Sequence, residues 1–208
     1  MVVCSREYRG STYLLREAVP SDCRLLYDWR MDPVTRAGSF GHDTFPYEEH
    51  EKWFRKLMAD PCRKQFILLR LPGRSASADS GTAEQPGTEH NAVGGSRAAE
   101  PQTTADAAGD ALPAATPAAQ LRLELSGQEA EISYSVAASE RGKGLGTLLI
   151  QMAVSYAGKL SGIRTLTAEV LPDNTASRRI FEKCGFHLSG EKPGKLLYIY
   201  KLKGDTDG

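Results

Sequence analysis

Apolar residues recur along this chain with two different spacings, one typical of strands and one typical of helices. Runs in which every second residue is apolar predict strands, and the clearest is residues 129–136, with Ala130, Ile132, Tyr134 and Val136 on one face. Apolar stripes at three- and four-residue spacing predict amphipathic helices, and the clearest is residues 145–160. The predicted strands are 13–18, 65–71, 120–125, 129–136, 165–170, one that begins at 186, and 196–202; the predicted helices are 22–30, 46–59, 145–160 and 176–184.

The order of these elements predicts an α+β fold, with a mixed sheet and helices on both of its faces. Asp32-Pro33 ends the first helix, because the residue before proline avoids the helical region. Residues 34–45, which contain Gly38 and Gly41, are expected to be irregular.

The composition changes abruptly between residues 73 and 118. Val93 and Leu112 are the only large apolar residues there, and no aromatic residue occurs. Such a segment buries too little apolar surface to offset its ordering entropy. We therefore expect one domain, residues 1–208, with a disordered low-complexity insertion at 73–118 in the loop between strands 65–71 and 120–125. A regulatory role for this loop is the alternative to a tolerated expansion.

The totals exclude several classes of function. Lys plus Arg and Asp plus Glu both number 26, so no basic excess favours nucleic-acid binding. No apolar stretch reaches the roughly 18 residues of a membrane span, and the charged first 20 residues do not resemble a signal peptide. The four cysteines form no CxxC pair and no histidine cluster accompanies them, so no metal site is expected. These features predict a cytoplasmic protein.

A glycine-rich stretch, residues 139–147 (SERGKGLGT), joins the clearest strand to the clearest helix. A strand, a glycine-rich turn and a helix start let backbone N–H groups converge on an anion. Glycine tolerates positive φ there and leaves room for a ligand to touch the backbone. Arg141 and Lys143 add positive charge, so we predict that this loop binds a pyrophosphate.

Two motifs resemble the GNAT family of N-acetyltransferases. Arg141-x-x-Gly144-x-Gly146 resembles its pyrophosphate signature, [Q/R]-x-x-G-x-[G/A]. Residues 174–186, which begin with Asn174-x-x-Ser177 and continue with Phe181-Glu182-Lys183-Cys184-Gly185-Phe186, resemble its second conserved element. The resemblance covers nearly the whole chain apart from the insertion. It implies a mostly antiparallel, twisted sheet that opens in a V between strands 129–136 and 165–170, and it implies acetyl-CoA as co-substrate.

The resemblance also implies which residues hold the cofactor. Backbone groups of Val136 and Ala138 would bind the pantetheine arm, together with the side chains of Asn174 and Ser177, and Phe181 would pack beside the thioester. The diphosphate would be held by the loop, that is by Arg141, Gly142, Lys143, Gly144, Leu145, Gly146 and Thr147.

A finer resemblance concerns the N-terminal half. Trp29-Arg30-x-Asp32-Pro33 and Glu48-Glu49-His50-x-x-Trp53-Phe54 are similar to the GNAT branch that acetylates the 4-amino group of nucleotide-linked amino sugars. The branch that acetylates the N-termini of ribosomal proteins shares part of the first pattern. The implied function is acetyl transfer from acetyl-CoA to a primary amine by direct attack in a ternary complex.

The acceptor is expected to be a small molecule, with a peptide as the alternative, and a non-catalytic acyl-CoA-binding module is the second alternative. A monomer or homodimer without nucleic-acid or membrane partners is expected. Arg30, Phe40 and His50 are the candidate acceptor-binding residues, although His50 shares an apolar stripe and fits a core position equally well.

The chemistry requires a base for the amine, a donor for the oxyanion and an acid for the thiolate. Glu131 is the candidate base, with a solvated or ion-paired strand residue as the equally weighted alternative. Many GNAT members carry a tyrosine where this chain has Phe181, so Tyr134, or alternatively Tyr198, is the candidate acid, unless no dedicated acid exists. The N–H of Val136 or Ala137 is the candidate oxyanion donor.

Overall fold

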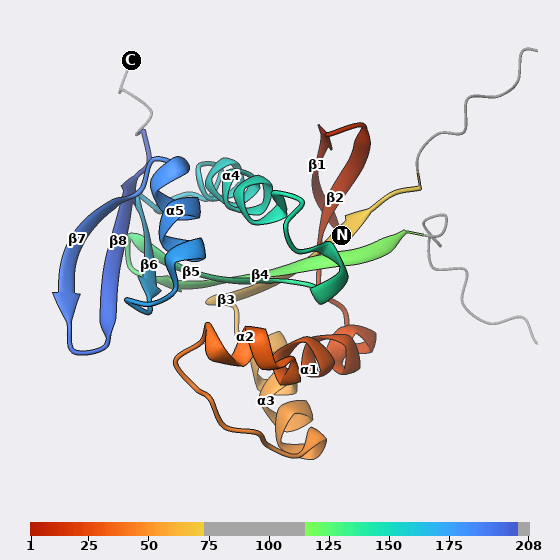
Figure 1. The fold of residues 1–208 in the computed structure, drawn as a ribbon. Helices are drawn as coiled ribbons and strands as arrows, with labels where there is room; N and C mark the ends of the chain where they lie inside the picture. Colours follow the sequence, from red (N-terminus) through yellow and green to blue (C-terminus); the bar gives the residue numbers. More distant parts are fainter. Residues whose placement is uncertain (73–114, 204–208) are drawn as a thin grey trace, which may run out of the picture.

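An eight-stranded sheet runs through the residues that the computed structural model describes, 1–72 and 115–203 (Figure 1). Its strand order is β1-β2-β3-β4-β5-β6-β8-β7, and every neighbouring pair is antiparallel except β5–β6. The strands are β1 (Val2–Tyr8), β2 (Ser11–Glu17), β3 (Arg63–Arg70), β4 (Thr116–Ser126), β5 (Glu129–Val136), β6 (Thr165–Val170), β7 (His187–Lys192) and β8 (Lys195–Lys201).

Helices cover both faces of this sheet, as predicted. Figure 1 shows α4 (Leu145–Ala157) and α5 (Thr175–Lys183) on one face, and α1 (Cys23–Met31), α2 (Pro33–Ala37) and α3 (Tyr47–Ala59) on the other. Two short 3₁₀ helices, η1 (Pro20–Asp22) and η2 (Ala138–Glu140), precede α1 and the glycine loop. The expected α+β fold with a mixed, mostly antiparallel sheet is confirmed.

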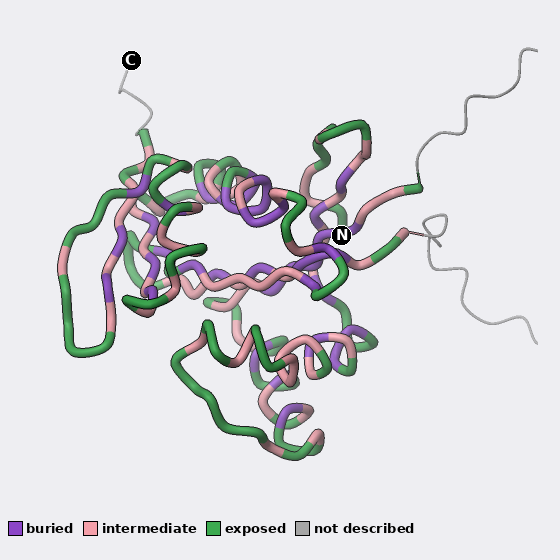
Figure 2. Tube along the Cα trace, viewed as in Figure 1, coloured by how far each residue is buried: buried purple, intermediate pink, exposed green. Residues whose placement is uncertain are grey.

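The apolar periodicities explain the two layers. In β3, Phe66 and Leu68 join the core under α4, whereas Ile67 and Leu69 join a second core under α1 and α3. All four side chains are buried, so this strand is apolar on both faces, as a central strand requires. Figure 2 shows buried stretches along the central strands and α4. The cavity described below lies on the α1–α3 side, where the sheet face becomes polar beyond this second core.

The sheet opens between β5 and β6. Their parallel pairing comprises Glu129–Thr165, Ala130–Leu166 and Glu131–Thr167, and it stops there. From Ile132 onward the backbone groups of β5 that face β6 have no strand beside them. This is the V that the resemblance implied.

Three segments differ from the predictions. β1 was not predicted, because its exposed edge position leaves little apolar pattern, and it is held by pairing with β2 across a turn in which Arg9 and Gly10 both have positive φ. The segment expected to be irregular contains α2, which Asp32 caps by accepting from the Thr35 N–H at 2.8 Å.

The expected insertion lies outside the described residues from 73 to 114. Its last predicted residues are instead the start of β4, because Ala118 and Ala119 are small enough to be fully buried in the sheet. None of the helices that the structure describes is long and apolar enough to cross a membrane.

Candidate active site

The glycine loop presents a row of unpaired backbone donors. Gly142 and Gly144 have φ of 75° and 81°, and Gly144 is the left-handed residue that precedes α4. Within the described residues, no acceptor is recorded for the N–H groups of Leu145, Gly146 and Thr147, which open the helix. Free N–H groups at a helix N-terminus favour an anion, so the loop fits the diphosphate that the resemblance assigned to it.

Neighbouring side chains press closely on this loop. A Cβ at Gly144 would collide with the Tyr8 hydroxyl from the β1–β2 turn. A Cβ at Gly146 would lie 2.8 Å from Cδ1 of Ile180 and 3.3 Å from Cε2 of Tyr134. The two motif glycines are therefore required by packing, and at Gly144 also by the backbone conformation. Tyr8 and Arg9 were not predicted to lie here, because β1 itself was not predicted.

The basic side chains of the loop are engaged elsewhere. Lys143 Nζ lies 3.0 Å from Oε1 of Glu140, a carboxylate only 3% exposed that also lies 3.5 Å from Arg70. Arg141 forms an ion pair with Asp32 and donates to the Thr35 hydroxyl at 3.0 Å. We predicted that both side chains add positive charge at the phosphates; in the structure each is paired with a carboxylate, so the loop offers its backbone instead.

Two side chains from the predicted cofactor site hold α2 in place. Arg141 binds its N-terminal end through Asp32 and Thr35, and the Asn174 amide donates to the Gly38 carbonyl at its C-terminal end, at 3.2 Å. The Asn174 side-chain oxygen caps α5 by accepting from the Ser177 N–H at 3.1 Å. Asn174 therefore caps α5 and holds the C-terminal end of α2, whereas we predicted that it binds the pantetheine arm.

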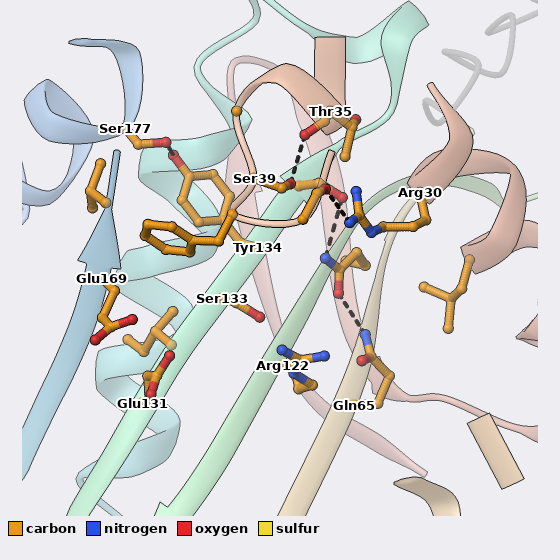
Figure 3. Close-up of a pocket in the computed structure, with 18 of the residues that line it drawn as sticks. Arg30, Thr35, Ser39, Gln65, Arg122, Glu131, Ser133, Tyr134, Glu169 and Ser177 are labelled. Carbon is orange, nitrogen blue, oxygen red and sulfur yellow. Dashed lines mark hydrogen bonds between the residues drawn. The ribbon is translucent and has the colours of Figure 1, made fainter. Parts of the chain in front are cut away.

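Beneath α2 lies a cavity of about 570 Å³. The loop after α2 forms one wall, α1 and α3 form the second, and the polar face of β3, β4 and β5 forms the floor (Figure 3). On this floor the Gln65 amide donates to Gln120 at 2.7 Å, and Gln120 donates to the Ser135 hydroxyl at 3.3 Å. The cavity reaches Asn174, Ser177 and Phe181 at the open V.

Of the two predicted oxyanion donors on β5 and just after it, the Val136 N–H is free for a ligand and the Ala137 N–H is not. The Ala137 N–H is already donated to the Ala118 carbonyl at 2.9 Å, so it is not available for an oxyanion. Neighbouring residues of a strand direct their N–H groups to opposite sides, so the Val136 N–H faces the V. Val136 thus stays the candidate donor, and Ala137 does not.

Tyr134 lies at the junction of the V and the cavity. Its hydroxyl is 3.1 Å from that of Ser177, and its ring meets Phe181 edge-on at 5.8 Å between centroids. Desolvation raises the pKa of Tyr134 to about 12, against a lowering by the Ser177 hydrogen bond, so the phenol is protonated at neutral pH. Phe181 itself is 2% exposed and belongs mainly to the core. Tyr198, the alternative acid, is buried and donates to Glu182 at 2.8 Å.

Two carboxylates line the cavity on the β5–β6 side. Glu131 and Glu169 lie close together in Figure 3, and Glu169 is paired with Lys195. Desolvation, followed by repulsion from Glu169 and Glu124, raises the pKa of Glu131. A carboxylate with a raised pKa is a stronger base than an ordinary one, and Glu131 has no ion-pair partner within 4 Å among the described residues.

The three candidate acceptor residues line the same cavity, Arg30 and His50 on the side away from the carboxylates and Phe40 next to the Lys195–Glu169 pair. Arg30 and His50 line the cavity from α1 and α3, and Phe40 lines it from the loop after α2, with Lys195 Nζ 4.5 Å from its ring. His50 is 3% exposed and surrounded by aromatic rings, so it is both a core residue and a lining residue. Sequence reasoning missed Arg122, Gln120 and Glu169, because polar residues that alternate in a strand are also typical of a solvated face.

The comparisons with known proteins agree with this geometry. Residues 105–187 match the family model described as acetyltransferase (GNAT) domain. The spermidine N-acetyltransferase from Vibrio cholerae in complex with CoA and spermine superposes with a TM-score of 0.64 at 14% identity, over 91% of this chain and 95% of that one. The chain has a GNAT fold. A domain from Methanocaldococcus jannaschii matches it as well, with a TM-score of 0.65 at 17% identity, over 92% of this chain and 99% of that one.

Two relatives from Bacillus subtilis match shorter stretches. The putative phosphinothricin acetyltransferase YwnH is 43% identical over 65 residues, or 31% of this chain and 39% of its own length. The probable N-acetyltransferase YjcK is 36% identical over 63 residues, or 30% of this chain and 35% of its own. The matches thus span well under half of each relative. The family model and both relatives are described as acetyltransferases, and the names of the relatives and of the solved structures give no common acceptor.

Proposed function

We propose that the protein is an N-acetyltransferase that moves the acetyl group of acetyl-CoA to a primary amine of a small molecule, by direct attack in a ternary complex. One observation carries the proposal: a single open V has a nest of free N–H groups at one end and a polar cavity of about 570 Å³ alongside it. A donor and an acceptor can therefore meet at the V without leaving the protein.

The residues present fit the donor. The unpaired N–H groups of Leu145, Gly146 and Thr147 suit a diphosphate. The free edge of β5, including the Val136 N–H, suits an extended arm that pairs like an added strand. Acetyl-CoA would supply the activated acetyl thioester.

The chain's own groups move the protons. Glu131, with its raised pKa, accepts a proton from the ammonium form of the acceptor, directly or through a water molecule. The Val136 N–H is placed to donate to the developing oxyanion. Tyr134 is protonated, and its hydroxyl lies at the V beside Ser177, so it is the group that can return a proton to the leaving thiolate.

We further propose a nucleotide-linked amino sugar as the acceptor. The segments that resemble that GNAT branch supply the walls of the cavity through Arg30, Glu49, His50 and Trp53. Aromatic and guanidinium groups of this kind suit a base and a phosphate. The relatives that act on other amines share only short stretches or the fold, so they do not decide the acceptor.

A thiol-release assay with acetyl-CoA tests the function. We expect release with small amines, above all a UDP-linked amino sugar, and not with peptide N-termini. Release only with peptides would replace the small-molecule acceptor by a protein, and tight acetyl-CoA binding without release on any amine would support a binding module instead.

Glu131→Gln tests the base. Loss of general base catalysis typically costs about 10²-fold or more in rate, so kcat should fall that far while the acetyl-CoA KM stays unchanged. In the unmodified enzyme, activity should decline as the pH falls through the raised pKa of Glu131, because the carboxylate must be ionised to accept a proton. Glu129→Gln, on the same strand but outside the cavity, is the matched control; an equal loss there would contradict the role of Glu131.

A further inference from the structure

Three buried nitrogen atoms at the wall of the cavity lack a hydrogen-bond partner. They are Nη1 of Arg30, Nε2 of His50 and Nε of Arg122, and none has a partner among the described residues. Buried polar atoms are rarely left unsatisfied, because each costs about 1–3 kcal/mol. Three such atoms around one cavity indicate a ligand that brings oxygen atoms to them.

Arg30 is aimed at this space from the end of α1. Its Nη2 donates to the Gly41 carbonyl at 2.5 Å, and its guanidinium lies 6.0 Å from the centre of the Phe45 ring. Desolvation, followed by repulsion from Arg36 and Arg122, lowers the pKa of Arg30. The guanidinium is thus partly removed from water and has no carboxylate within 4 Å among the described residues.

Arg122 approaches from the floor. Its guanidinium lies over the Trp53 ring, 5.7 Å from the ring centre, and its Nε is 3.0 Å from a Glu124 oxygen but poorly aligned for a hydrogen bond. Burial lowers the pKa of Arg122 as well, only partly offset by Glu124. Two desolvated cations that repel each other across one cavity are destabilising unless an anion lies between them.

His50 adds a neutral polar atom to the same wall. Desolvation lowers the pKa of His50, which favours the uncharged imidazole near neutral pH. Its ring is packed among Tyr27, Phe45, Trp53 and Phe54, and a hydrogen bond to the Cys23 backbone partly offsets the desolvation. In the uncharged ring Nε2 is therefore left to accept a hydrogen bond from a ligand hydroxyl.

The charges of the cavity are segregated. Figure 3 shows Glu131 and Glu169 together on the β5–β6 side and Arg122 and Arg30 on the other side. In the pairing of β4 with β5, Arg122 lies opposite Ser133. Glu131 precedes Ser133 by two residues on β5, so Arg122 and Glu131 are diagonal neighbours on one face of the sheet. Glu49 also lines the cavity from α3, but no ion pair joins it to either arginine.

We propose that the acceptor carries an anionic, oxygen-rich group, a phosphate or a carboxylate, which Arg30 and Arg122 bind while a neighbouring hydroxyl donates to His50 and the amine faces Glu131. This inference rests on the proposed function and adds the subsite that would bind the anionic group of the acceptor. It predicts that polyamines are poor acceptors, although spermidine acetyltransferases share the fold, because a polycation in this cavity would lie near two arginines.

Matched amines test the inference by activity. Glucosamine 6-phosphate is compared with glucosamine, methionine with methioninamide, and spermidine serves as the cationic amine. We expect at least a tenfold higher kcat/KM for the anionic member of one pair, and which pair responds tells phosphate from carboxylate. Neutral amines or spermidine used as well as the anionic ones would overturn the proposal.

Substitutions of Arg30 and Arg122 test whether these residues cause the preference for anionic amines. Arg122→Gln and Arg30→Gln should each reduce the preference for the anionic amine at least tenfold, with the acetyl-CoA KM changed less than about twofold. Arg55→Gln is the control, because Arg55 is an exposed arginine on α3 that pairs with Glu51. Equal losses on both members of a pair would assign Arg30 and Arg122 a structural role.

A binding measurement separates this inference from the proposed function. Trp53 lies under Arg122, so its fluorescence should respond to inorganic phosphate or acetate added with CoA saturating, and a Trp53→Phe variant identifies the signal. We expect Arg122→Gln to weaken anion binding at least tenfold and Arg55→Gln to leave it unchanged. If no amine is acetylated, anion binding that depends on Arg122 still supports the subsite, and its absence overturns it.

Discussion

At the scale of single residues, the glycine loop acts through its backbone. Gly144 has a φ of 81°, and the Tyr8 hydroxyl occupies the position that a Cβ would take. We therefore expect Gly144→Ala to displace the loop from Tyr8 and misdirect the N–H groups of Gly146 and Thr147. Titration calorimetry should show acetyl-CoA affinity reduced at least tenfold.

The control for this change is Gly127→Ala. Gly127 also has positive φ, 57°, but a Cβ there would meet nothing within 4 Å. Its substitution should cost about 1 kcal/mol of stability through backbone strain and leave acetyl-CoA affinity unchanged. If both variants bind acetyl-CoA like the original protein, the loop is not the diphosphate site.

Much of the candidate site could be predicted at this scale. Glu131, Tyr134, Arg30, Phe40 and His50 do line one cavity. Arg30 and His50 could be named from the motifs that contain them, and Glu131 and Tyr134 from their strand beside the V. The partners of charged side chains could not be predicted. Arg141 pairs with Asp32, 109 residues away, and that pairing depends on how α2 is placed over the loop.

At the scale of elements, α2 depends on the Asp32–Arg141 ion pair. Asp32→Asn keeps a residue that caps helices well but removes the charge. We expect a loss of about 1 kcal/mol or less, as is typical of a partly exposed ion pair, and a severalfold higher acceptor KM, because α2 and the loop after it cover the cavity. Urea unfolding and steady-state kinetics measure the two effects.

The pH dependence of this effect has a definite sign. The Arg141 hydrogen bond lowers the pKa of Asp32, so its stabilisation is present above the ordinary aspartate pKa and is lost as the pH falls through the lowered one. The stability difference between the original protein and Asp32→Asn should therefore vanish in acid. Asp28→Asn, whose partner Arg24 is exposed, is the control; an equal change in acceptor KM there would contradict a special role of α2.

Two strands with clean alternation were predicted to the residue, whereas the clearest helix, predicted as 145–160, ends at Ala157. The bounds of β5 and β6 agree with the prediction, since both alternate cleanly. β1 and α2 are short, and tertiary bonds hold them: β1 through its pairing with β2, and α2 through Arg141 and Asn174. Local pattern carries little information about segments that depend on distant partners.

At the scale of the whole molecule, the fold should not need residues 75–112. Arg70 at the end of β3 and Thr116 at the start of β4 are register partners, so a short linker can join these strands. Replacing the segment with a flexible linker of about six residues should raise stability by about 1 kcal/mol, from the smaller loop-closure entropy. Thermal unfolding and kcat/KM measure the outcome; loss of folding would show that the segment belongs to the domain's core.

The short pairing of β5 with β6 links ligand binding to the cohesion of the whole sheet. Only three residue pairs join these strands, and beyond them one edge of β5 lacks a neighbour. A ligand that formed hydrogen bonds with that edge would add contacts between the two parts of the sheet that β5 and β6 join. Because it would bind the folded chain alone, at a hundred times its dissociation constant it would add about 2.7 kcal/mol to the free energy of unfolding. Substrate supply would then help to set the lifetime of the folded protein as well as its turnover.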